Sequence, residues 1–284
     1  MRVILTFLFL FAILIGMSSE SPKVFNGFLI SEGSSGKKIT FNNPKRHNAM
    51  SLEMWREGAT AIEECIASND IRVIVLSGAG EKAFVAGADI SKFGEERNSR
   101  QDIDEYNQAV KYFQDTLFNS PIPTIAKIKG YCIGGGLAIA LCCDLRIASD
   151  DSRFAVPAAK LGLGYPAGGI ERLMQIVGPS FAMEIFYTAR QFNAEEAMIM
   201  GLINRIVPSN ALTEFCDGYT DRISSNAPLT IRAVKTAVVE NLKAPPDRNI
   251  ALCEEQVSAC FASNDYLEGR TAFIEKRKPQ FTGT

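Results

Sequence analysis

Three consecutive glycines, Gly134, Gly135 and Gly136, are the residues whose arrangement points most directly to chemistry. They stand between an apolar, strand-like run at 125–128 and an apolar, helix-like run at 137–141. The first N–H groups of a helix lack intrahelical partners and carry the positive end of the helix dipole. Glycines leave room for an oxygen to approach those groups. The triplet therefore predicts an oxyanion hole, although a tight turn requires glycines equally often.

A second segment of small residues follows the β-branched run at 73–76, and it reads Ala-Phe-Val-Ala-Gly-Ala-Asp-Ile over 83–90. Together the two segments resemble the enoyl-CoA hydratase/isomerase (crotonase) family, which has an Ala-Phe-x-Ala-Gly-x-Asp-Ile loop, a downstream Gly-Tyr-x-x-Gly-Gly-Gly and then a Cys-Asp. The later motifs are Gly130-Tyr131 with the triplet, and Cys143-Asp144. The match continues to the C-terminal segment 273–279 and covers roughly everything after residue 22.

The resemblance implies an α/β fold: a crotonase-like superhelix of ββα turns with a C-terminal helical region. We expect three parts, namely an apolar leader or mis-assigned start at 1–17, a core at 18–218, and a helical region at 219–284 for oligomerisation and for covering the coenzyme A site. The family usually forms trimers or dimers of trimers, so the resemblance also implies a homo-oligomer.

Two backbone donors are implied by the same match. Ala88 and Gly135 occupy the positions of the family's oxyanion donors, which act through their N–H groups, so small side chains suffice. Each such donor typically contributes ~3 kcal/mol of transition-state stabilisation. The expected substrate is an acyl-CoA thioester, whose carbonyl is polarised and whose enolate is stabilised between these donors. Coenzyme A enters as part of the substrate, and no separate bound cofactor is expected.

The resemblance fails where hydratases carry their acid/base pair. The family's two glutamates correspond to Ala138 and Ala158, and alanine transfers no proton. Loss of one positioned acid or base typically costs 10²–10⁴-fold in rate, so hydration of an enoyl-CoA is in doubt. Tyr165 replaces a proline of the hydratases and is a candidate to orient or protonate the substrate, unless it only packs. The remaining acids worth testing are Glu95, Glu96 and Glu171.

Basic side chains at two places are candidates for binding coenzyme A. The family's chain lines the coenzyme A groove just after the first strand, and a C-terminal basic side chain often meets the phosphates, sometimes from a neighbouring subunit. A solvated basic helix end explains the C-terminal cluster equally well. Asp89 is expected to cap loop backbone rather than act as a base. The predicted binding residues are Lys45, Arg46, His47, Ala86, Asp89, Ile90, Lys276 and Lys278.

Composition narrows the functional classes. The chain has 284 residues, 46% of them apolar, and a net charge of −2, so no basic field attracts nucleic acid or an anionic membrane. Its single histidine, His47, excludes metal sites built on several histidines, and we expect no metal. Seven cysteines without a Cys-x-x-Cys argue against a disulfide framework and for a cytoplasmic protein.

The N-terminal segment is ambiguous. Arg2 precedes an almost wholly apolar stretch, 3–17, which has the shape of a signal peptide but is short for a membrane span. Translation that begins at Met17 explains the segment as well and fits the cytoplasmic character of the rest. Export through residues 1–17 is the alternative.

The spacing of apolar residues predicts the strands and helices that position these residues. Strands are expected at 38–41, 72–76, 145–148 and 153–156, and a helix capped by Ser51 runs to about 68. A second amphipathic helix carries Tyr106, Ala109, Phe113 and Leu117, and helices dominate after Gly168. This alternation of short strands and helices argues independently for an α/β architecture.

The leading hypothesis is an acyl-CoA lyase or isomerase of fatty acid metabolism that stabilises a thioester enolate. Decarboxylation of a malonyl-type CoA fits the missing glutamates, because loss of CO₂ forms the enolate without a base. Isomerisation or hydrolysis with an acid supplied elsewhere fits them too. The alternative of another class is a non-catalytic acyl-CoA-binding protein that retains the glycine framework.

Overall fold

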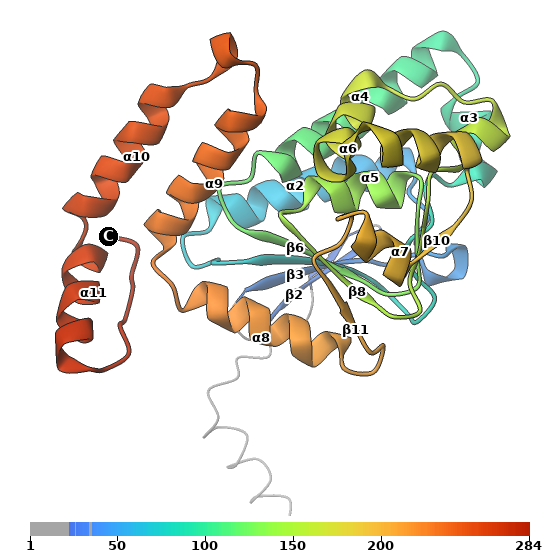
Figure 1. Ribbon diagram of the computed structural model, residues 1–284. Helices are drawn as coiled ribbons and strands as arrows, with labels where there is room; N and C mark the ends of the chain where they lie inside the picture. The colour runs from blue at the N-terminus through green and yellow to red at the C-terminus, as the bar shows by residue number, and fades with distance from the viewer. Residues whose placement is uncertain (1–22, 26, 34–35) are drawn as a thin grey trace, which may run out of the picture.

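The computed structural model describes residues 23–25, 27–33 and 36–284 (Figure 1). The expected leader at 1–17 lies outside the described residues. Within the described ranges, no helix is long and apolar enough to cross a membrane.

The larger sheet holds seven strands, and its centre is parallel. Its order is β1-β2-β3-β4-β6-β8-β11, in which β1, β2 and β3 pair antiparallel and the later neighbours pair parallel. The central strands β4, β6 and β8 are buried along most of their lengths, as expected for parallel strands covered on both faces. The strands are β1 (Lys23–Phe25), β2 (Phe28–Glu32), β3 (Lys37–Phe41), β4 (Ile74–Gly78), β6 (Thr124–Ile128), β8 (Leu145–Ser149) and β11 (Arg205–Val207).

A smaller sheet, in the order β10-β9-β7-β5, completes the repeating turns. Each turn sends one strand to the large sheet, the next to the small sheet, and then a helix: β4-β5-α4, β6-β7-α5 and β8-β9-α6. The expected ββα turns are therefore confirmed. The additional elements are β5 (Ala83–Val85), β7 (Tyr131–Ile133), β9 (Arg153–Ala155), β10 (Phe192–Asn193), α4 (Arg100–Phe118), α5 (Gly135–Cys142) and α6 (Ala167–Thr188).

The helical layer over the large sheet begins with α2 (Leu52–Ala67), which the sequence predicts within a residue at each end. The Ser51 hydroxyl accepts the Met54 N–H at 3.3 Å and caps the helix, a contact worth ~1 kcal/mol. The four apolar positions predicted for α4 are all buried. Figure 1 shows α2, α4, α5 and α6 on one side of the sheet and α8 (Leu212–Ser224) on the other.

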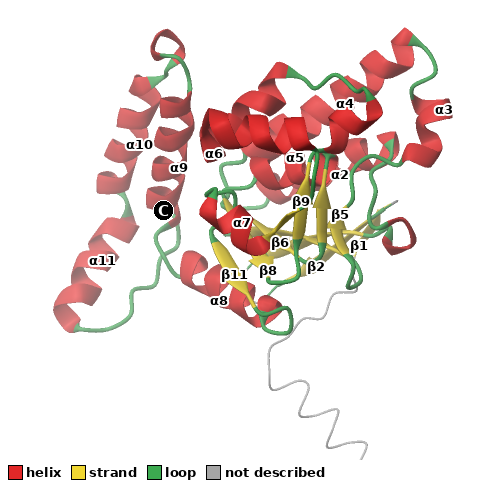
Figure 2. Cartoon of the chain, turned by 45° about the vertical axis from the view of Figure 1, so that its right-hand side comes forward, coloured by secondary structure: helices red, strands yellow, loops and turns green. Residues whose placement is uncertain are grey.

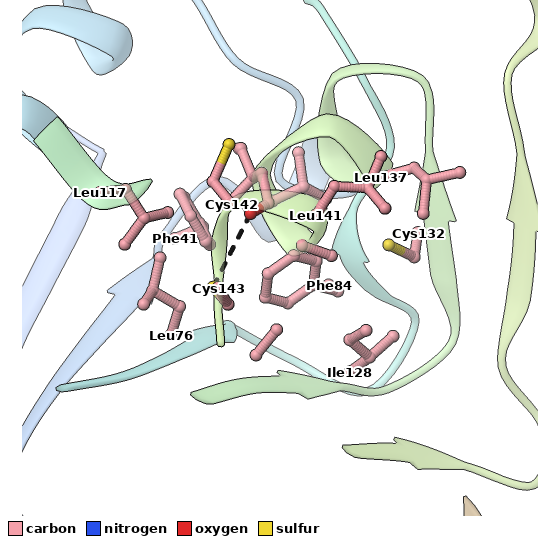
Figure 3. Close-up of a cluster of buried hydrophobic side chains, with 14 of the residues drawn as sticks. Phe41, Leu76, Phe84, Leu117, Ile128, Cys132, Leu137, Leu141, Cys142 and Cys143 are labelled. Atoms are coloured by element: carbon pink, nitrogen blue, oxygen red, sulfur yellow. Dashed lines mark hydrogen bonds between the residues drawn. The ribbon is translucent and has the colours of Figure 1, made fainter. Parts of the chain in front are cut away.

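Alternate residues of the central strands enter separate cores. Ile74 and Leu76 face the helical layer, whereas Val73 and Val75 face α8. Figure 3 shows the core beneath α5, where Leu137 and Leu141 pack with Phe84 and other strand residues. All seven cysteines are free, and five of them are buried, which confirms the expectation that they form no disulfide framework.

Three C-terminal helices form an arm that stands beside the body in both views (Figures 1 and 2). They are α9 (Pro228–Leu242), α10 (Ile250–Ala262) and α11 (Asn264–Glu275). Lys235 fixes α9 to the body through the Asp144 carboxylate at 2.8 Å. The predicted core end, residue 218, lies within α8, and the helices that leave the body are α9–α11.

Candidate active site

The glycine triplet turns β7 into α5. Gly134 takes φ 54° and ψ −113°, a backbone conformation suited to glycine, and its N–H donates to the Ala155 carbonyl at 2.8 Å. The helix begins at Gly135, and its first hydrogen bond runs from the Ala138 N–H to the Gly134 carbonyl at 3.0 Å. The N–H of Gly135 therefore precedes the first helical bond and donates to no carbonyl in the described part of the chain.

The loop after β5 presents a second N–H of the same kind. Gly87 has φ 103°, and the Met50 N–H donates to its carbonyl at 2.8 Å. The Asp89 N–H donates in turn to the Met50 carbonyl at 2.9 Å. These two bonds form a parallel bridge between Met50 and Ala88, which leaves the N–H of Ala88 on the opposite side. No described carbonyl accepts it.

The two loops lie in contact. A Cβ built on Gly135 would sit 3.6 Å from both Cα and C of Gly87. The nitrogen of Ala88 is bonded to that carbon at ~1.33 Å. Two N–H groups without acceptors among the described residues thus lie on adjoining loops. This is the backbone arrangement that an oxyanion hole requires, and the assignment of Ala88 and Gly135 as its donors stays a prediction.

The two alanines border this junction. Ala138 lies one helical turn beyond Gly134, and Ala158 lies in the 3₁₀ helix Pro157–Leu161. The Cδ of Pro157 is 4.0 Å from the Cβ position of Gly134, so the segment carrying Ala158 packs against the triplet. Both alanines are 8% exposed. Methyl groups, rather than carboxylates, therefore stand at both places.

Tyr165 packs in the loop before α6. Its ring meets that of Phe186 edge-on, with centroids 4.8 Å apart. Burial raises the pKa of Tyr165 to about 12, so its hydroxyl stays protonated at neutral pH and can donate but not act as a base. Its predicted catalytic role stays a prediction.

The first basic segment lies beside the loop of Ala88. The His47 carbonyl accepts the Ala86 N–H at 3.0 Å, and the Arg46 guanidinium is 3.9 Å from the Asp89 carboxylate. Asp89 also accepts the Ser91 N–H at 3.1 Å, a capping contact of the kind expected for it. The side chains of Lys45, Arg46, His47 and Ile90 are exposed.

The second basic segment lies elsewhere in the chain. Lys276 ends α11 in a left-handed conformation, and Lys278 follows in the tail. Both views place α11 apart from α5 and β5 (Figures 1 and 2). The single chain therefore does not bring these lysines to the other predicted site residues.

A buried polar wall formed by Trp55, Tyr106 and Arg97 lies beside Gly135, and the sequence did not predict it. The Cζ2 of Trp55 is 3.4 Å from the Cβ position of Gly135, and its indole N–H donates to the Tyr106 hydroxyl at 2.8 Å. The Arg97 guanidinium stacks 3.9 Å from the centre of the Tyr106 ring. Helical periodicity predicted the position of Tyr106 on an apolar helix face, but it carries no signal for its hydrogen bond with Trp55 or for the closeness of Trp55 to the triplet.

Known proteins are similar to this chain over most of its length. The family model described as enoyl-CoA hydratase/isomerase matches residues 32–284. The chain belongs to the enoyl-CoA hydratase/isomerase family.

Individual members of the family are similar over nearly their full lengths. The short-chain-enoyl-CoA hydratase of Clostridium acetobutylicum is 36% identical over 241 residues, which cover 84% of this chain and 91% of that protein. The crotonyl-CoA hydratase of Syntrophomonas wolfei is 34% identical, with 86% and 93% covered. A crystal structure of an enoyl-CoA hydratase/carnithine racemase from Magnetospirillum magneticum superimposes with a TM-score of 0.88 at 32% identity, covering 95% and 100%. The fold is thus the crotonase fold.

Proposed function

We propose that this protein is an acyl-CoA enzyme that stabilises a thioester enolate between the N–H groups of Ala88 and Gly135. The observation that carries the proposal is the contact between two loops that each hold an N–H with no acceptor in the described part of the chain. Fixed donors in a site that excludes water stabilise developing charge strongly, because they need no reorganisation as the charge forms. The family membership supplies the substrate class.

Hydration fits the site poorly. Adding water across a double bond needs one group to activate water and another to protonate carbon, whereas Ala138 and Ala158 offer neither. Decarboxylation and isomerisation need at most one proton carrier once the enolate is stabilised. We therefore place the protein among the enolate-forming members of the family rather than among efficient hydratases.

Crotonyl-CoA tests this proposal in two independent ways. Its hydration removes the conjugated enoyl absorbance, and its binding can be followed by the fluorescence of Trp55, the single tryptophan of the chain, which contacts the triplet. We expect crotonyl-CoA to bind saturably. Its hydration should be at least 10²-fold slower than hydration by the crotonyl-CoA hydratase of Syntrophomonas wolfei measured in the same assay. Efficient hydration would contradict our reading of the alanines, and absent binding would contradict the substrate class.

We further propose that the C-terminal arm packs against a second copy of the chain. The helices α9, α10 and α11 enclose an apolar groove of about 800 Å³. Phe273 and Ile274, which line it, are 87% and 77% exposed in the single chain. Exposed apolar surface of this extent is typical of an interface. Assembly of this kind also gives Lys276 and Lys278 a route to the coenzyme A phosphates of a neighbouring subunit.

Replacing Phe273 and Ile274 together by aspartate should therefore lower the oligomeric state. Two carboxylates would have to be buried in an apolar contact, which is strongly unfavourable. Light scattering coupled to size exclusion should show a multiple of the chain mass for the wild type and single chains for the variant. Val24→Asp, at a side chain 72% exposed on β1, is the control and should leave the assembly intact. A wild-type monomer would refute the proposal.

The seven free cysteines are consistent with a reducing compartment. We accordingly propose a cytoplasmic location.

A further inference from the structure

Glu96 holds a carboxylate oxygen with no assigned role. Its Oε1 accepts the N–H of Leu52, the first residue of α2, at 3.1 Å. Its Oε2 is buried and has no hydrogen-bond partner among the described residues. A buried acceptor without a partner costs ~1–3 kcal/mol, so it calls for an explanation beyond capping the helix.

The fold returns this carboxylate to the neighbourhood of the predicted oxyanion donors. Ala88 bridges to Met50, and the chain then leaves through two short helices, Ile90–Lys92 and α3 (Phe93–Glu96). Glu96, the last residue of α3, brings the chain back because its carboxylate accepts the N–H of Leu52, which is only two residues after Met50. Adjacent strands lie ~4.8 Å apart and two residues span at most ~7 Å, so Leu52 lies within ~12 Å of Ala88. The Glu96 carboxylate, 3.1 Å from the Leu52 nitrogen, therefore lies within ~15 Å of Ala88.

The surroundings of Glu96 are the buried wall beside Gly135. Arg97 stacks between the Phe93 and Tyr106 rings, 4.3 and 3.9 Å from their centres, and its Nε is also buried, with no hydrogen-bond partner in the described ranges. Burial raises the pKa of Tyr106, and the nearby charge of Glu96 adds to the rise. The Tyr106 hydroxyl binds Trp55, whose ring contacts the triplet. The Glu96 charge thus lies near a polar cluster of Arg97, Tyr106 and Trp55 that reaches the triplet.

The other candidate carboxylates already have hydrogen-bond partners or are exposed to solvent. Asp89 accepts both the N–H and the hydroxyl of Ser91 and faces Arg46. Glu95 and Glu171 are exposed to solvent. Among the acids named from the sequence, Glu96 alone combines a shielded oxygen with free hydrogen-bonding capacity in the described structure.

We propose that Glu96 is the proton carrier of this enzyme, in place of the absent carboxylates at 138 and 158. The inference rests on the proposed enolate chemistry. The Glu96 carboxylate removes the proton from C2 of the acyl group, and the C–H electron pair forms the enolate whose oxygen carries the negative charge. The resulting carboxylic acid either exchanges its proton with solvent and then protonates C2, giving hydrogen exchange, or delivers its proton to C4 of a 3-enoyl thioester, giving the 2-enoyl isomer. One carboxylate and no co-reactant complete the cycle.

Hydrogen exchange at C2 of butyryl-CoA in deuterated water, followed by mass spectrometry, tests the proposal. Glu96→Gln keeps Oε1 as the acceptor for Leu52 but cannot take a proton, so exchange should fall at least 10²-fold. Glu95→Gln alters the neighbouring exposed acid and should change the rate less than threefold. Trp55 fluorescence should show butyryl-CoA affinity within threefold of wild type for both variants, and both should unfold within a few degrees of it.

Results other than these would contradict either the role of Glu96 or the proposed acyl-CoA function. Exchange by Glu96→Gln at the wild-type rate would overturn the role of Glu96 and leave the enolate chemistry standing. Binding by the wild type with neither exchange at C2 of butyryl-CoA nor isomerisation of a 3-enoyl-CoA would also overturn that role, because no carboxylate would then be removing the proton. Neither binding nor exchange by the wild type would instead overturn the proposed acyl-CoA function itself.

Discussion

Replacement of Gly135 by proline is expected to lower enolate-forming turnover by about 10²–10³-fold while the protein stays folded. Gly135 is the first residue of α5, and its N–H makes no bond to a described carbonyl. Proline is favoured at this first helical position, because the N–H that it lacks has no helical partner there. The substitution therefore removes the proposed donor, and the ring fills the space in front of it.

The matched control is Gly135→Ala, which retains the N–H. A Cβ at this position would lie 3.4 Å from Trp55 Cζ2 and 3.6 Å from Gly87, so the Cβ of either variant meets the same neighbours. Turnover should be measured as exchange at C2 of butyryl-CoA and as decarboxylation of malonyl-CoA, with thermal unfolding as the test of folding. A proline variant as active as the alanine variant would show that the Gly135 N–H does not stabilise the transition state.

Backbone chemistry explains why this part of the site could be predicted from sequence. A donor that acts through its N–H leaves a signature of small residues, and such residues are visible in the printed chain at 83–90 and 134–136. The helix predicted at 137–141 is confirmed as a continuous apolar run that is buried throughout. The predicted buried positions of α4 are confirmed because local spacing determines which face of an amphipathic helix is apolar.

The parts that escaped prediction depend on distant residues. β7 spans three residues, Tyr131–Ile133, between the strand β6 and the triplet, and so short a run carries no period of its own. Its register comes from pairing with β5 and β9. Likewise, Glu96 is 44 positions from Leu52 in the sequence. Sequence alone did not distinguish it from the other two candidate acids, and only the fold brings its carboxylate to the Leu52 N–H. Pairing across such separations is a property of the topology rather than of any window of sequence.

Gly136 holds the glycine triplet and the loop after β5 at their observed spacing. A Cβ on Gly136 would lie 2.0 Å from the carbonyl oxygen of Val85 and 2.8 Å from its carbon, and both are backbone atoms of β5. Real Cβ atoms do not approach backbone this closely, and β5 is itself paired to β7. Gly136→Ala should therefore force α5 and β5 apart and reduce the free energy of unfolding by about 3 kcal/mol or more.

The same displacement should reach the site, because Val85 is followed within three residues by Ala88. Turnover should then fall together with stability, whereas the Gly135 variants should separate the two. Gly218→Ala is the control: Gly218 lies inside α8 with nothing within 4 Å of its Cβ position, so alanine there should raise stability by ~1 kcal/mol through helix propensity. Denaturant unfolding measures both changes. A Gly136→Ala protein within 1 kcal/mol of wild type would mean that the loops can separate at little cost, and their spacing would then be no requirement for the chemistry.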